Sequence, residues 1–135
     1  MTHSISFAER NSIIVGKLTG LACLDGFRAY VTELLQPPYA GVPCPILSDL
    51  TELDARSISA VDIRKLVEFV GSNRDQIGPN RHAILVSQPL SFGLARMYEL
   101  LAQESDPQPT NVFDNREKAL HWLMRGEKVA AGLRT

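Results

Sequence analysis

Side chains that could bind a small molecule lie near the ends of two segments that are typical of strands. Asp49 and Thr51 fall at the end of an apolar run at 44–50, and Gln88 falls near the end of another run at 81–89. The carboxyl ends of parallel strands meet at one edge of a sheet, beside the first turns of the following helices, and ligands gather there. With residues from two expected helix starts, the predicted ligand-binding set is Asp49, Thr51, Ser57, Ser59, Gln88, Ser91, Phe92, Gly93 and Arg96.

Two members of this set allow opposing interpretations. Gly93 lies in the first turn of an expected helix at 90–103, where a glycine costs roughly 0.5–1 kcal/mol relative to alanine. Its missing Cβ would let the helix approach either a ligand or a neighbouring backbone closely. Arg96 could reach an acidic group of a ligand or partner, or it could pair along the surface with Glu99, three residues later.

Catalytic and metal-binding patterns are not evident. The acidic residues Asp49, Glu52 and Asp54 would need further carboxylates after the first strands to resemble a metal-bound phosphoacceptor site, and Asp25 falls inside the next helix instead. The sequence contains no nucleophile elbow, Walker motif or dinucleotide fingerprint. We therefore predict no catalytic residue, metal or cofactor. An enzyme that uses Asp49 with His82 or a rim serine is the alternative.

Composition favours an ordinary soluble domain. The chain has 135 residues, a formal net charge of −1 and 44% hydrophobic residues, so nothing attracts nucleic acid or an anionic membrane. No apolar run approaches the roughly 20 residues of a membrane span. We expect a cytoplasmic protein with one domain at 1–126, followed by a helical extension or tail at 127–135.

Hydrophobic periodicity predicts an α/β fold with the element order β-β-α-β-α-β-α-β-α. An antiparallel hairpin opens the chain, and a mostly parallel central sheet with helices packed on it follows, because each later strand precedes a helix. The expected strands are 4–8, 12–18, 44–50, 81–89 and 110–113, and the expected helices are 21–35, 59–70, 90–103 and 114–125, with a loop at 51–59.

Helix-capping patterns mark three of the expected helix starts. Ser59 is followed by Asp62 in a capping-box spacing, and Asp114 is followed by Glu117 in the same spacing. Ser91 is placed to cap the helix after the fourth strand, and Gly126 is placed to end the last one.

This order resembles the SpoIIAA-like branch of the STAS superfamily, named for sulphate transporters and anti-sigma factor antagonists. The resemblance covers roughly residues 5–124. It is carried by Phe-Gly-Leu-Ala-Arg-Met at 92–97 and by Val-Phe-(x)5-Lys-Ala-Leu-x-Trp-Leu at 112–123. The resemblance implies a small bacterial binding or regulatory module rather than an enzyme. Some relatives of this branch are grouped with CRAL-TRIO lipid carriers, which implies an apolar ligand.

One departure from the superfamily pattern concerns phosphorylation. The anti-sigma factor antagonists carry a phosphorylatable serine in an Asp-Ser-Ser-Gly motif, whereas the matching place here is Ser57-Ile58-Ser59-Ala60. Ser57 and Ser59 are the phosphorylation candidates, since a phosphate is favourable at a helix N-terminus. The alternative for Ser59 is a structural N-cap.

The leading hypothesis is therefore a non-catalytic STAS-like binding or regulatory domain that carries a small apolar or amphipathic, lipid-like ligand. The alternatives are a phospho-regulated interaction module and a small enzyme of unknown reaction. A homodimer is an open option for partner binding. If the core were incompletely packed, an apolar pocket would be lined by Phe27, Tyr30, Leu66, Phe69, Val70, Met97, Tyr98 and Leu101; the alternative is a filled core.

Overall fold

A computed structural model describes residues 1–10, 12–77, 80–103 and 108–124. Its elements are β1 (Thr2–Ala8), β2 (Ile13–Leu21), α1 (Leu24–Leu34), β3 (Ile46–Asp54), α2 (Ala60–Ser72), α3 (Arg74–Ile77), β4 (His82–Leu85), α4 (Pro89–Ala102), β5 (Thr110–Phe113) and α5 (Arg116–Met124). Apart from the short α3, this is the predicted order. The expected tail at 127–135 and the expected helix end at Gly126 lie outside the described residues.

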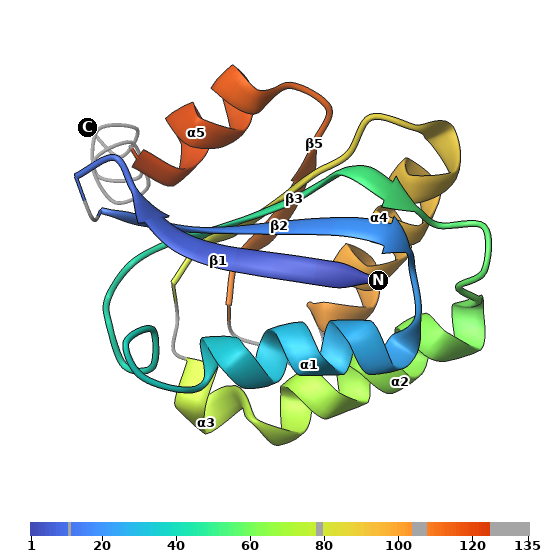
Figure 1. The fold of residues 1–135 in the computed structure, drawn as a ribbon, viewed down its shortest axis with the longest axis horizontal. Helices are drawn as coiled ribbons and strands as arrows, with labels where there is room; N and C mark the ends of the chain where they lie inside the picture. The colour runs from blue at the N-terminus through green and yellow to red at the C-terminus, as the bar shows by residue number, and fades with distance from the viewer. Residues whose placement is uncertain (11, 78–79, 104–107, 125–135) are drawn as a thin grey trace.

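The sheet has five strands in the order β1-β2-β3-β4-β5. β1 pairs with β2 in antiparallel fashion, and the remaining neighbours are parallel. Helices α1, α2 and α4 cover one face of the sheet and α5 covers the other (Figure 1). The predicted α/β fold, with its opening hairpin and parallel centre, is confirmed.

Strand alternation divides the core between these two faces. In β4, His82 and Ile84 lie on the three-helix face, while Ala83 and Leu85 pack beside α5. A strand covered on both faces is apolar at nearly every position, which is why this segment has a continuous hydrophobic run. The two cores are Leu18, Ala22, Tyr30, Leu53, Ala55, Ile58, Ile63, Leu66, Val70, Ile84, Val86, Ala95, Tyr98 and Ala102 on the three-helix face, and Ile13, Leu47, Ala83, Leu85, Ala119 and Leu123 on the α5 face.

The prediction that residues 51–59 form a loop is wrong for the first four of them. β3 continues to Asp54. Between β2 and β3 the register shifts, because Lys17 pairs with Asp49 while Thr19 pairs with Glu52. One extra residue in β3 makes a β-bulge and interrupts the two-residue alternation by which a strand is recognised in sequence.

The capping box at the start of α2 is confirmed. The Ser59 N–H donates to Asp62 Oδ2 at 2.9 Å, and the Asp62 N–H donates to Ser59 Oγ at 3.2 Å. The hydrogen bond from the Ser59 backbone is the main reason that the pKa of Asp62 is lowered.

The other two predicted caps are wrong. Helix α4 begins two residues before Ser91, at Pro89, whose fixed φ suits the first helical position. Gln88 is its N-cap residue and makes no side-chain capping bond. At α5, Asn115 replaces Asp114, since Asn115 Oδ1 accepts the Lys118 N–H at 3.0 Å.

Candidate functional site

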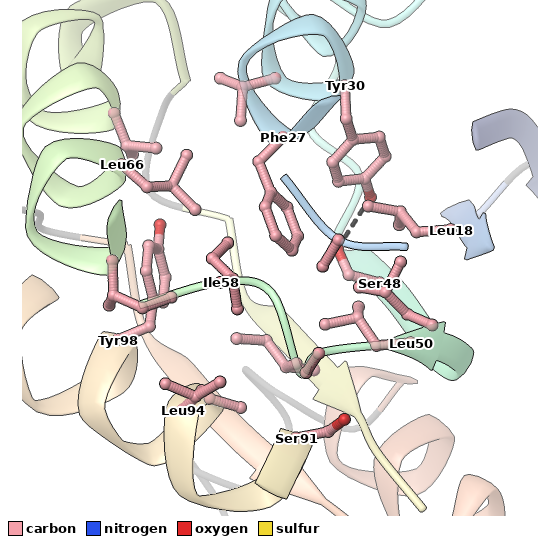
Figure 2. A pocket seen from close by; sticks show the side chains of 18 of the residues that line it. Leu18, Phe27, Tyr30, Ser48, Leu50, Ile58, Leu66, Ser91, Leu94 and Tyr98 are labelled. Carbon is pink, nitrogen blue, oxygen red and sulfur yellow. Dashed lines mark hydrogen bonds between the residues drawn. The ribbon is translucent and has the colours of Figure 1, made fainter. Parts of the chain in front are cut away.

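An apolar cavity of about 90 Å³ lies between the sheet and helices α1, α2 and α4 (Figure 2). Of the eight helical residues expected to line such a pocket, Phe27, Tyr30, Leu66, Val70 and Tyr98 do so, and Phe69, Met97 and Leu101 do not. The full lining is Leu18, Ala22, Phe27, Tyr30, Val31, Ser48, Leu50, Leu53, Ala55, Ile58, Ile63, Leu66, Val70, His82, Ile84, Ser91, Leu94, Ala95 and Tyr98.

The β-bulge helps to build the floor of this cavity. Strict alternation along β3 would place Leu50 and Leu53 on opposite faces of the sheet. With one extra residue at the bulge, both leucines line the cavity, as Ser48 does. The irregularity that hides the end of β3 in the sequence therefore contributes to the pocket.

A chain of three polar side chains borders the cavity. The hydroxyls of Tyr30 and Ser48 share a buried hydrogen bond of 2.7 Å, and Ser48 Oγ lies 2.8 Å from His82 Nε2. Gly16 makes room for this arrangement, because a Cβ at that position would overlap the Tyr30 ring and hydroxyl. Sequence reasoning missed this arrangement. Ser48 and His82 lie in apolar strand segments, and hydrophobic periodicity does not determine how two strands are aligned with each other.

Burial keeps the side chains of Tyr30 and His82 uncharged at neutral pH. Desolvation lowers the pKa of His82 to about 4 and raises the pKa of Tyr30, in each case disfavouring the charged form. His82 is therefore a neutral imidazole at pH 7. The chain supplies hydrogen bonds to the cavity wall and no charge.

Ser91 also lines the cavity, and it lies apart from these three side chains. It is 5% exposed. Within the described part of the chain, no group lies within hydrogen-bonding reach of its Oγ atom. Figure 2 shows Ser91 at the first turn of α4, well apart from the hydrogen-bonded Tyr30 and Ser48. Buried hydroxyls are normally paired, so an unpaired one on a cavity wall requires an explanation.

A smaller cavity of about 60 Å³ lies next to the first. Tyr30, Val70, His82 and Tyr98 are among the residues that line both. Its wall includes more polar side chains, among them Gln76. The three-helix face of the sheet is thus incompletely filled in two adjoining places. A close-packed core would leave neither of them.

Most of the predicted rim residues lie away from the cavity. Ser91 lines it, and the other eight do not. Asp49, Thr51, Ser57, Ser59, Gln88, Phe92, Gly93 and Arg96 lie instead at the edge or surface of the domain or on the α5 side.

Asp49 belongs to the α5 side of the sheet. Its Oδ1 accepts the backbone N–H and the hydroxyl of Thr51, at 2.9 and 2.6 Å, and its Oδ2 lies 3.6 Å from the Arg116 guanidinium. Asp49 pairs along the sheet with Leu85, three residues beyond His82, and points to the opposite face. The structure separates the Asp49 and His82 pair on which the enzymatic alternative rested.

Arg96 pairs with Glu99 rather than pointing toward the cavity, which is the surface role among the two roles expected for it. Its guanidinium donates to Glu99 Oε1 at 2.7 Å. Glu99 is nearly buried, with 4% exposed, and its Oε2 accepts the backbone N–H of Val112 at 3.1 Å. The pair therefore joins α4 to β5, a link that the sequence did not predict.

Gly93 makes no close approach in this structure. A Cβ built at Gly93 would meet no described atom within 4 Å. The expectation that its missing Cβ admits a neighbouring backbone is wrong, and the close approach occurs at Gly16 instead. Among the described residues, no group of three or more histidine, cysteine, aspartate or glutamate side chains is placed to hold a metal ion.

Comparison with known proteins rests on structure. Neither a family model nor a curated protein sequence matches the chain. The crystal structure of an uncharacterized protein from the DUF3478 family with a SpoIIAA-like fold, from Shewanella loihica PV-4, does match. The two sequences are 26% identical, the match covers 90% of this chain and 92% of that chain, and the TM-score is 0.55. This chain has a SpoIIAA-like fold.

The SpoIIAA-like domain has its cavity on the face covered by α1, α2 and α4. The match supports a STAS-like architecture, as the sequence motifs at 92–97 and 112–123 implied. None of the helices described here is long and apolar enough to cross a membrane.

Proposed function

We propose that this SpoIIAA-like domain is a non-catalytic binding module that carries a small apolar or amphipathic ligand in the cavity beneath α1, α2 and α4. The observation that carries the proposal is the cavity itself, about 90 Å³ in volume and lined almost entirely by hydrocarbon. Apolar cavities of on the order of 100–150 Å³ stay dry and take up small apolar molecules such as benzene or xenon.

The pocket is partly open to solvent, and its wall is almost entirely apolar. A bound apolar molecule would cover part of that wall and gain contacts with it, which favours binding. A ligand that binds the folded state alone also stabilises it, so binding would be coupled to folding.

A phospho-regulated interaction module is the alternative. Ser57 and Ser59 are both exposed near the start of α2, where a kinase could reach them. The Ser59 hydroxyl is already used in the capping box, and a phosphate there would face the Asp62 carboxylate. Detection of phosphate on either serine in cells would support this alternative.

A cavity-filling variant tests the ligand proposal. Ala95 lines the cavity from α4, so Ala95→Leu would fill part of it with a side chain that helices favour. Ala29 is exposed on α1, so Ala29→Leu makes the same chemical change without touching the cavity. Each protein is sprayed under native conditions, extracted into organic solvent, and compared with an unrelated protein from the same host. Each is also titrated with toluene.

We expect a stoichiometric small molecule, or saturable toluene binding, in the wild-type protein and in Ala29→Leu. Ala95→Leu should lose either signal while melting at the same temperature or higher. A bare wild-type protein that also fails to bind toluene would contradict the proposal. So would binding that survives in Ala95→Leu.

A further inference from the structure

The two cavities on the three-helix face share part of their walls. The first cavity measures about 90 Å³ and the second about 60 Å³. The residues that line both are Tyr30, Val31, Val70, His82 and Tyr98. A residue that lines both cavities lies between them, so these five form a partition that separates one cavity from the other.

The cavities follow one another along the strands. On β2, Ile14 lines the second cavity, and Leu18, further along the strand, lines the first. Helix α1 runs back from the arrowhead of β2 (Figure 1), and it meets the cavities in the reverse order, with Phe27 on the first and Leu34 on the second. Four strand residues or seven helix residues span roughly 10–13 Å. Together the two cavities therefore make an elongated space parallel to the strands.

Neither cavity alone has room for a large occupant. An apolar cavity of about 150 Å³ takes up one benzene molecule, and both cavities are smaller than that. Tyr30 and His82 are held in the partition by their hydrogen bonds to Ser48. The remaining partition residues come from α1, α2 and α4, so a helix side chain could move and join the cavities without breaking those bonds. A ligand of more than a few carbon atoms is then best accommodated across both.

The two ends of this space differ in polarity. The wall of the first cavity exposes almost only carbon, and the hydroxyls of Tyr30 and Ser48 are bonded to each other. The wall of the second cavity exposes more polar surface, and it includes the solvent-exposed Gln76 and the amide of Asn80. A polar group placed in the first cavity would lose its hydrogen bonds to water without replacement, which costs free energy. Polar atoms of a ligand are therefore favoured in the second cavity.

We infer that the ligand is an elongated amphipathic molecule, whose hydrocarbon tail fills the first cavity and whose polar end lies in the second, on the side of Gln76. This inference rests on the proposed function, because it requires the first cavity to be a ligand site. It adds a length and a direction to the bound molecule. It also assigns the second cavity a role in selecting ligands by length.

The first test measures dissociation constants by NMR titration with toluene and with 1-butanol, 1-hexanol and 1-octanol, which share one hydroxyl and differ in length. Val42 lines the second cavity and not the first, so Val42→Phe narrows the second cavity alone. Val61→Phe makes the same change at an exposed position of α2 that lines neither cavity.

In the wild-type protein and in Val61→Phe, each added methylene should tighten binding roughly 3- to 4-fold through 1-octanol, as expected for burial of hydrocarbon. In Val42→Phe, 1-butanol should bind as in the wild type. The longer chain should find no room there, so 1-octanol should bind at least roughly 10-fold more weakly than it does to the wild type.

The second test locates both ends of 1-octanol in the wild-type protein by intermolecular NOEs, and it does not depend on any variant. We expect the terminal methyl group to contact Ile63 and Leu94, which line only the first cavity. The hydroxyl-bearing methylene should contact Leu34 and Ile77, which line only the second.

Several results would overturn the inference while leaving the first cavity as a ligand site. They are an octanol-to-butanol affinity ratio that Val42→Phe leaves unchanged, NOEs from both ends of 1-octanol to the first cavity alone, and NOEs that show the opposite direction. Toluene and 1-butanol that bind with no further gain for the longer alcohols would do the same. If the wild type binds none of the four probes, the proposed function itself fails. If Val42→Phe does not fold, the NOE pattern of the wild type decides.

Discussion

At the residue scale, Gly16 is required for packing, whereas Gly93 only lowers the helix propensity of α4. A Cβ at Gly16 would overlap the Tyr30 ring, whereas a Cβ at Gly93 would meet nothing within 4 Å. We expect Gly16→Ala to lower the free energy of unfolding by about 1–3 kcal/mol, because Tyr30 must move and lose its bond to Ser48. Gly93→Ala should raise it by about 0.5–1 kcal/mol through helix propensity alone.

Urea unfolding of the two variants beside the wild type measures both effects. The opposite signs are the diagnostic feature, since each variant controls for the general effect of adding a methyl group. A stable Gly16→Ala protein would mean that Tyr30 has room to retreat. A destabilised Gly93→Ala protein would mean that α4 approaches a group outside the described residues.

At the element scale, the start of α2 depends on the Ser59 side chain. Ser59→Ala removes the acceptor for the Asp62 N–H and keeps the Ser59 backbone N–H that donates to Asp62. We expect the free energy of unfolding to fall by about 1 kcal/mol in urea titrations. Ser57→Ala, two residues earlier and exposed, should change it by less than about 0.5 kcal/mol. Equal effects of the two substitutions would argue against the capping role.

Sequence patterns predicted the helices and strands whose apolar residues repeat with one constant period. The apolar stripes of α1, α2 and α4 and the run at β4 were recognised, and five of the eight expected pocket residues line the cavity. The end of β3 was not recognised, because its bulge breaks the period of two. Ser91 was expected both to cap α4 and to bind a ligand at the sheet edge; it lies inside α4 rather than at its cap, and it is among the residues that line the cavity.

At the scale of the whole molecule, the cavity and the polar chain depend on strand register. The contact between Ser48 and His82 requires β3 and β4 to pair with Ile46 opposite His82. Nothing in a single sequence fixes that offset, because shifts by two residues preserve every apolar face. The fold class was therefore within reach of sequence reasoning, and the geometry of the site was not.

The same buried chain should make the stability of the whole domain depend on pH. The pKa of His82 is about 4 in the folded protein and near 6.5 when unfolded, so the unfolded state binds more protons between those values. Stability contributed by the neutral imidazole is complete above about pH 6.5 and is lost as the pH falls toward 4. We expect His82 to account for about 3 kcal/mol of destabilisation between pH 7 and pH 4. His82→Gln offers an amide in place of the imidazole and removes this titration, so urea unfolding across the range should show a shallower acid slope for the variant. Parallel slopes for the two proteins would mean that His82 titrates normally and that water reaches the wall of the cavity.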